Sequence, residues 1–144
     1  MLYIHHLKGY SEIVYKDYER IVDKSNITII KKLCKAHLFN YDYRIKYTKE
    51  IFNIRTRIPI YISENLIFIP TKSPRNYDNV WVNYANINHI SKINGKTKVV
   101  FNNLKEIMVD ISYDSLLKNI NHVKRIIDHM NHIKAFIDDS LYRM

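Results

Sequence analysis

Basic residues in loops and at the ends of predicted elements are the part of this sequence best suited to chemistry, namely the binding of phosphate groups. Arg and Lys side chains carry a full positive charge, and Arg can contact a phosphate through two parallel N–H groups. Two of these residues lie in the segment 71–76, where Pro70 and Pro74 restrict the backbone. Loops at neighbouring ends of a sheet could merge such residues into one positive surface. The candidate nucleic-acid-binding residues are Arg44, Lys46, Arg55, Arg57, Lys72 and Arg75.

The overall charge of the chain agrees with a polyanionic partner. Its 23 Lys and Arg residues exceed its 14 Asp and Glu residues, which gives a net charge of +9 at pH 7. Such an excess favours nucleic acid first and an anionic membrane surface second. The chain is also rich in Ile, Lys, Asn and Tyr, as AT-rich coding sequences are, so part of the lysine excess is independent of function. The charge still favours nucleic acid over a merely basic surface.

The sequence lacks the residue combinations that known catalytic sites and metal sites require. The two glycines, Gly9 and Gly95, are too far apart for a phosphate-binding loop. His122, His129 and His132 lie near one face of a predicted helix, but no cysteine or carboxylate is placed to complete a tetrahedral zinc site. We therefore predict no enzyme activity, no cofactor and no metal site.

The elements that must position the basic residues centre on a predicted hairpin. Two runs rich in β-branched and aromatic residues, Ile58–Ile62 and Leu66–Ile69, are separated by the turn-forming residues Ser63–Asn65. Val80–Val82 follows the proline-containing loop as a third strand, and Trp81 is predicted to fill the core. The pattern predicts a rigid sheet that presents a cationic loop.

Two helices are predicted before this hairpin. Apolar residues recur at helical spacing from Ser25 to Leu38, and Cys34 falls on the apolar side as a buried residue. After an interruption at Asn40–Asp42, a second helix is predicted over Tyr43–Asn53. Two helices joined by a short turn leave a helix-turn-helix mode of DNA binding open as an alternative.

Further strands are predicted on both sides of these elements. Residues 1–22 fit either two strands in a hairpin broken near Lys16–Asp17, or one strand followed by irregular chain. Beyond Trp81, Asn94–Gly95 is a strong hairpin signal because both residues accept a positive φ. The predicted strands there are Ile87–Ile93, Thr97–Phe101 and Ile107–Ile111.

A long C-terminal helix, capped by Ser112 or Asp114, is predicted to pack on the sheet. This packing predicts an α+β fold with a central antiparallel sheet, a helical segment before the sheet and the long helix after it. We expect one domain over residues 1–144. Part of its apolar face could be shared with a second copy in a dimer. The residues of that face are Leu116, Ile120, Val123, Ile127, Met130, Ile133 and Ile137.

Two segments also resemble a known family. Residues 57–82, R-I-P-I-Y-I-S-E-N-L-I-F-I-P-T-K-S-P-R-N-Y-D-N-V-W-V, are similar to the central signature of the bacterial competence transcription factor ComK. Residues 99–115, V-V-F-N-N-L-K-E-I-M-V-D-I-S-Y-D-S, resemble that family's passage from two strands into a helix start. The resemblance covers roughly residues 27–135. Asn and Asp replace the family's loop glycines near Arg44 and Lys46, although the charge is kept.

The resemblance implies a transcriptional activator of DNA-uptake genes. Such proteins bind paired AT-rich boxes of double-stranded DNA from the minor groove, as dimers that assemble in pairs, and RNA polymerase is a further expected partner. The family is also degraded through a proteolytic adaptor that binds a tail beyond the last helix; only a few residues follow that helix here, so this partnership stays open.

The alternatives are a basic protein-interaction module of the same fold and an RNA-binding protein. The single cysteine suits a reducing cytoplasm. No apolar stretch is long enough to span a membrane, and the N-terminus lacks a signal-peptide core. We therefore expect a cytoplasmic protein with no membrane partner.

Overall fold

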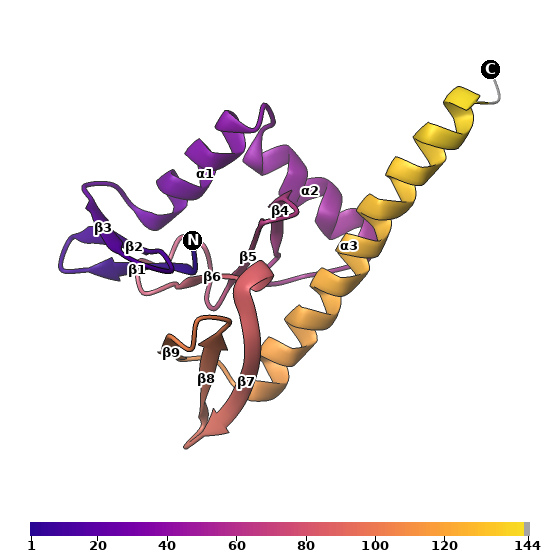
Figure 1. Cartoon of the computed structure of the whole chain (residues 1–144). Coiled ribbons are helices and arrows are strands. Elements are labelled where there is room, and N and C mark those ends of the chain that lie inside the picture. The colour runs from indigo at the N-terminus through magenta and orange to yellow at the C-terminus, as the bar shows by residue number, and fades with distance from the viewer. Residues whose placement is uncertain (143–144) are drawn as a thin grey trace.

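The computed structural model describes residues 1–142. In these residues two antiparallel sheets pack with three α-helices (Figure 1). This α+β architecture confirms the predicted fold class. Side-chain surroundings are described for residues 1–133 and 135. The helices are α1 (Asn26–Ala36), α2 (Tyr41–Phe52) and α3 (Tyr113–Tyr142), with a 3₁₀ turn η1 (Tyr84–Asn86). The strands are β1 (Tyr3–Leu7), β2 (Tyr10–Val14), β3 (Glu19–Val22), β4 (Ile60–Ser63), β5 (Leu66–Pro70), β6 (Trp81–Asn83), β7 (Ile87–Ile93), β8 (Lys96–Phe101) and β9 (Glu106–Val109).

The larger sheet has the strand order β3-β2-β1-β6-β5-β4, so the N-terminal strands lie beside the central ones. Ile4 of β1 is opposite Trp81 of β6. The antiparallel pairing of β2 with β3 confirms a hairpin around Lys16–Asp17. The sequence did not predict β1, because two adjacent histidines interrupt its apolar pattern and one of its partners is distant along the chain.

The central hairpin forms from β4 and β5, with Tyr61 opposite Ile67. β4 begins at Ile60, two residues later than predicted. The backbone of Arg57 has φ 48°, in the left-handed region, and Pro59 has no N–H for a sheet hydrogen bond. Both features keep residues 57–59 outside the strand.

The smaller sheet has the order β7-β8-β9. Asn94 and Gly95 join β7 to β8 with φ values of 46° and 78°, which confirms the predicted turn. The sequence predicted these strands but not their separation into a second sheet, since each strand pattern is the same in either arrangement.

Side chains cap all three helices at their N-termini. Ser25 Oγ accepts a hydrogen bond from the Thr28 N–H in α1, and Asn40 Oδ1 accepts one from the Tyr43 N–H in α2. At α3, Ser112 Oγ accepts from the Ser115 N–H at 3.2 Å, so Ser112 is the cap rather than Asp114. The asparagine cap starts α2 two residues earlier than predicted.

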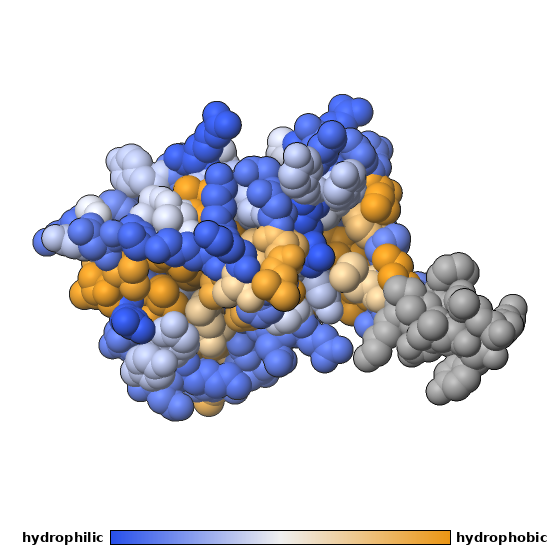
Figure 2. All heavy atoms as spheres, turned by 90° about the horizontal axis from the view of Figure 1, so that it is seen from above, coloured by the Kyte–Doolittle hydropathy of each residue, from blue (hydrophilic) through white to orange (hydrophobic). Residues whose placement is uncertain are grey.

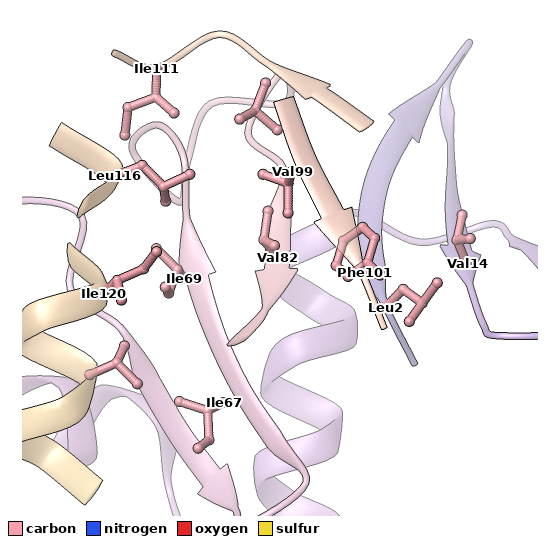
Figure 3. Close-up of a cluster of buried hydrophobic side chains, with 12 residues drawn as sticks. Leu2, Val14, Ile67, Ile69, Val82, Val99, Phe101, Ile111, Leu116 and Ile120 are labelled. Atoms are coloured by element: carbon pink, nitrogen blue, oxygen red, sulfur yellow. The ribbon is translucent and has the colours of Figure 1, made fainter. Parts of the chain in front are cut away.

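The six-stranded sheet is covered on both faces. On one face it packs against α3 and the smaller sheet, and Figure 3 shows Ile67 and Ile69 of β5 with Val99 of β8 and Leu116 of α3 in this cluster. Phe68, which alternates with its β5 neighbours, points to the opposite face.

The second cluster lies under α1 and α2 and includes Trp81 and Cys34, both fully buried as predicted. Burial raises the pKa of the Cys34 thiol to about 11.

The apolar face of α3 is buried only in its first half. Ile127 and Met130 are half-buried, Ile133 is 41% exposed, and Ile137 lies outside the described side chains. Figure 1 shows the helix projecting past the sheets. Among the described side chains of α3, the buried apolar ones are Leu116, Ile120, Val123 and Ile126. The first half of the helix therefore packs on the sheets, and around Ile126 and Met130 it also packs against Phe52 of α2.

Candidate nucleic-acid interface

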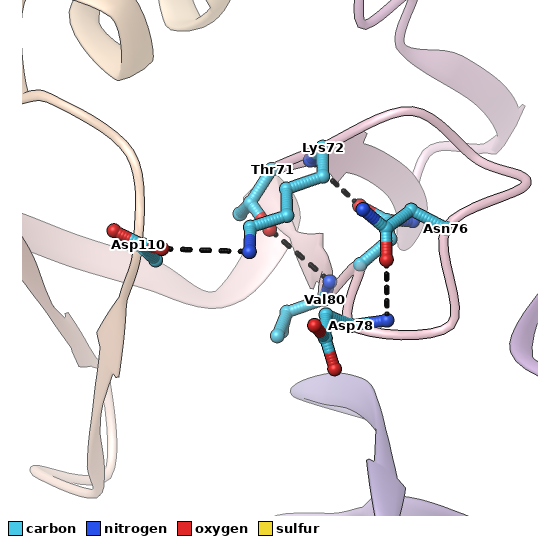
Figure 4. A network of polar contacts seen from close by, with 7 residues as sticks. Thr71, Lys72, Asn76, Asp78, Val80 and Asp110 are labelled. Carbon is cyan, nitrogen blue, oxygen red and sulfur yellow. Dashed lines mark hydrogen bonds and ion pairs between the residues drawn. The ribbon is translucent and has the colours of Figure 1, made fainter.

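The loop between β5 and β6 is fixed by side-chain hydrogen bonds as well as by its prolines (Figure 4). Asn79 Oδ1 accepts from the Lys72 N–H at 2.9 Å, and Thr71 Oγ1 accepts from the Val80 N–H at 3.1 Å. At the tip, Asn76 Oδ1 accepts from the Asp78 N–H at 2.9 Å. These bonds close the loop at its base and at its tip, so few backbone conformations remain open to it.

A buried polar chain ties the same loop to the N-terminal elements. Asn26, the first residue of α1, donates from Nδ2 to the Asn79 carbonyl oxygen at 2.8 Å, and its Oδ1 accepts from the Ser11 hydroxyl. Ser11, Asn26 and Asn79 are all buried. The His6 ring also contacts Tyr77 edge-on. Sequence analysis missed these residues because asparagine and serine at element ends resemble ordinary turn residues.

Three of the six predicted basic residues gather around this loop. Pro74 lines two hollows. One is also lined by Arg55, Arg57 and Ser73, and the other by Arg75 and Lys24. Among the described residues, neither hollow has an Asp or Glu in its lining, and none of these four cations lies within ion-pair distance of an acidic group. We call Lys24, Arg55, Arg57 and Arg75 the basic face.

The other three predicted residues lie elsewhere. Lys72 Nζ is 3.4 Å from Asp110 Oδ2 (Figure 4). Arg44 donates from Nη1 to the Tyr61 carbonyl oxygen at 2.8 Å and stacks over the Phe39 ring, and burial lowers the pKa of its guanidinium. Lys46 is exposed on α2. Arg44 thus holds α2 against β4, and a DNA contact by any of the three stays a prediction.

A protein-family model matches most of the chain, including this region. The family model described as ComK protein matches residues 2–133, which include the loop, the basic face and most of α3. The chain belongs to the ComK family. ComK proteins are transcription factors of competence, so the family match supports a role in transcription regulation. No curated protein and no solved structure shows a significant match to the chain.

The ComK match starts at residue 2, well before the region in which the two quoted segments resemble the family. The added region contains Ser11 and Asn26, which anchor the loop, and Lys24 of the basic face. The N-terminal strands are therefore part of the family fold and support the candidate interface directly.

Arg57 differs from the other basic-face residues in its backbone conformation and in its unpaired side-chain donor. Its left-handed backbone, at φ 48°, costs a non-glycine residue about 1–2 kcal/mol. Its Nε is buried and donates to no acceptor among the described residues. Strained backbone conformations cluster at functional sites, and an unpaired buried donor is rare enough to call for a specific partner. Both features make Arg57 a candidate ligand-binding residue.

The three histidines of α3 are not arranged as a metal site in the described structure. His129 packs edge-on against Phe52, His132 is exposed, and His122 lines a separate hollow with Ser115 and Lys118. Over the described residues, no three potential metal ligands are grouped. In the same part of the chain, no helix combines the length and apolar character that crossing a bilayer requires.

Proposed function

We propose that this ComK-family chain is, as one domain, a sequence-specific DNA-binding activator of competence genes that binds AT-rich boxes through the minor groove. The observation that carries the proposal is the basic face, where Arg55, Arg57 and Arg75 adjoin a loop whose shape is held by internal hydrogen bonds. A fixed loop places its cations without a large loss of conformational entropy on binding.

The minor groove suits this arrangement better than the major groove. Narrow minor grooves of A·T-rich DNA concentrate negative potential and attract inserted arginine side chains. A loop with an exposed Arg75 at its tip can enter such a groove, whereas the major groove is normally filled by a helix or a two-stranded ribbon. The helix-turn-helix alternative would use α1 and α2 instead, with Lys31 or Lys32 facing DNA.

We expect the protein to prefer AT-rich duplex to GC-rich duplex and to structured RNA, and a minor-groove ligand such as netropsin to displace it. Competition binding with these three nucleic acids at one stated salt concentration measures the preference. Equal affinity for all three would favour a non-specific basic module, and strongest binding to RNA would favour an RNA-binding protein. Footprinting with protection confined to guanine N7 in the major groove would contradict the minor-groove mode.

Exposed apolar residues support a dimer. Tyr43, Tyr47 and Ile51 follow one another at every fourth position of α2 and are each more than half exposed, and Ile133 lies on the projecting part of α3. Figure 2, which views the molecule from the side of α1 and α2, shows separate hydrophobic areas between hydrophilic ones. A second copy that covers this row would remove apolar surface from water.

We therefore expect at least a dimer at micromolar concentration, measured by sedimentation of the free protein. Ile51→Glu should weaken self-association by about tenfold or more, since it puts a charge into an apolar contact. Met108→Glu, an exposed apolar residue on β9, is the matched control and should leave association unchanged. A wild-type protein that sediments as a monomer, both free and on a single DNA box, would contradict the dimer.

A further inference from the structure

A polar hollow that shares Arg55 and Arg57 with the basic face lies between the segment that leads into β4 and the first turns of α3. One wall is formed by residues 53–57, which include two left-handed backbone conformations, at Asn53 and Arg57. The other wall is formed by Ser115, Lys118, Asn119 and His122. Polar surface predominates in it, unlike the hollow beside Ser73 and Pro74.

Two side chains that line this hollow each have a buried hydrogen-bond donor with no acceptor in the described part of the chain. The donors are Arg57 Nε and Asn119 Nδ2, and Asn119 is only 4% exposed. Buried polar groups in native proteins are nearly always hydrogen-bonded, so two unpaired donors on side chains that line one hollow point to an external acceptor.

The charge of the hollow selects the kind of acceptor. Arg57, Arg55 and Lys118 line it, and within the described residues no carboxylate does. Burial, with Arg125 and Lys118 nearby, lowers the pKa of His122, so its ring adds hydrogen-bonding capacity at neutral pH without a full charge. Ser115 belongs to the first turn of α3, where the helix dipole favours an anion. An anionic acceptor interacts with these cationic side chains more strongly than a neutral water molecule does.

We propose that this hollow binds a phosphate group, with Arg57 Nε and Asn119 Nδ2 as donors and Lys118 as the counter-charge. The phosphate can come from the backbone of a bound duplex or from free inorganic phosphate, because the recognised chemistry is the same. Only the duplex source rests on the proposed DNA binding.

Thermal unfolding of the full chain with inorganic phosphate tests the site, with sodium chloride as the salt at matched ionic strength. The melting temperature of the wild type should rise with phosphate and saturate. Asn119→Leu, which removes one donor at similar volume, and Lys118→Ala should each raise the apparent Kd for phosphate about tenfold or more. Lys124→Ala removes an exposed lysine of the same helix that is not part of this hollow, and should respond as the wild type does.

Phosphate also stabilises proteins generally through its exclusion from their surface. An equal rise in all four proteins would therefore overturn the proposal, and so would the absence of any rise in the wild type. Lys118 is exposed, so Lys118→Ala keeps the test decisive even if Asn119→Leu does not fold.

Duplex binding as a function of salt identifies the source of the phosphate. If the DNA backbone supplies it, Lys118→Ala should lower the log–log salt slope by about one relative to the wild type. An unchanged slope, together with the lost phosphate response, would assign the hollow to free phosphate. A wild type that responds to phosphate but does not bind AT-rich duplex would contradict the proposed function and leave the phosphate site standing.

Discussion

Trp81→Ala is expected to lower the free energy of unfolding by about 3–5 kcal/mol. The indole is fully buried between the six-stranded sheet and the helices α1 and α2, in contact with the cluster that contains Ile30 and Phe68. The Tyr41 ring meets it edge-on, with centroids 6.4 Å apart. Its removal therefore leaves a cavity at the strand pairing that joins β1 to the central strands. Equilibrium denaturant unfolding, followed by circular dichroism, measures the loss.

Trp81→Phe is the matched control for this prediction. The phenyl ring retains much of the packing, and the substitution also removes the indole Nε1, which has no hydrogen-bond partner among the described residues. We expect a clearly smaller loss of stability than for alanine. DNA binding by either variant should fall only in proportion to its unfolded fraction. A variant that stays folded but no longer binds would show that Trp81 contacts DNA.

Arg75→Ala is expected to weaken binding to AT-rich duplex by about 1–3 kcal/mol. Arg75 is exposed, pairs with no acidic side chain in the described structure, and is carried by a loop that hydrogen bonds hold in place. Its removal should change the stability of the fold by no more than about 0.5 kcal/mol. Titration of AT-rich and GC-rich duplexes at several salt concentrations, with thermal unfolding in parallel, measures both effects. If Arg75 enters the minor groove, the loss should be larger on the AT-rich duplex.

Two further substitutions give this measurement its controls. Lys72 already lies near Asp110, so Lys72→Ala should cause a smaller loss that is the same on both duplexes, as for a phosphate contact. Lys32→Ala removes an exposed lysine of α1 and reports the effect of general basicity. Should Lys32→Ala lose as much affinity as Arg75→Ala, the DNA surface would lie on α1 and α2 rather than on the loop.

Features that depend on neighbours in the chain were predictable from the sequence. Asn94–Gly95 forms a turn because both residues tolerate positive φ. The start of α3 was predicted with Ser112 or Asp114 as its cap, and Ser112 is the cap because its hydroxyl reaches an N–H three residues on. The apolar runs on either side of Ser63–Asn65 gave the central hairpin, and Trp81 and Cys34 were predicted to be buried from their places in apolar patterns. The same local patterns carried the resemblance to the family.

The tertiary structure decided which basic residues lie together. From the sequence, Arg44 and Arg75 were equally good candidates for DNA contact. In the structure, however, the Arg44 guanidinium packs on the Phe39 ring and donates a hydrogen bond to the Tyr61 carbonyl oxygen. Lys72 shares the loop with Arg75 but lies near Asp110, which precedes α3. Lys24 joined the basic face only because β2, α1 and the loop meet through Asn26. These outcomes depend on contacts between residues far apart in the chain, and the local pattern around each residue holds no information about its distant partner.

The same reason explains the separation of the two sheets and the place of β1. The run of β-branched and aromatic residues that marks a strand is the same whichever strand lies beside it, so this pattern predicts a strand but not its neighbours. Pairing of β1 with β6 is settled by the packing of both faces of the sheet, where Ile4 and Trp81 pack under α1 and α2 while Leu2 and Val82 face α3. The sequence therefore determined most of the elements and the family, and the packing between distant elements determined the surface that those elements present.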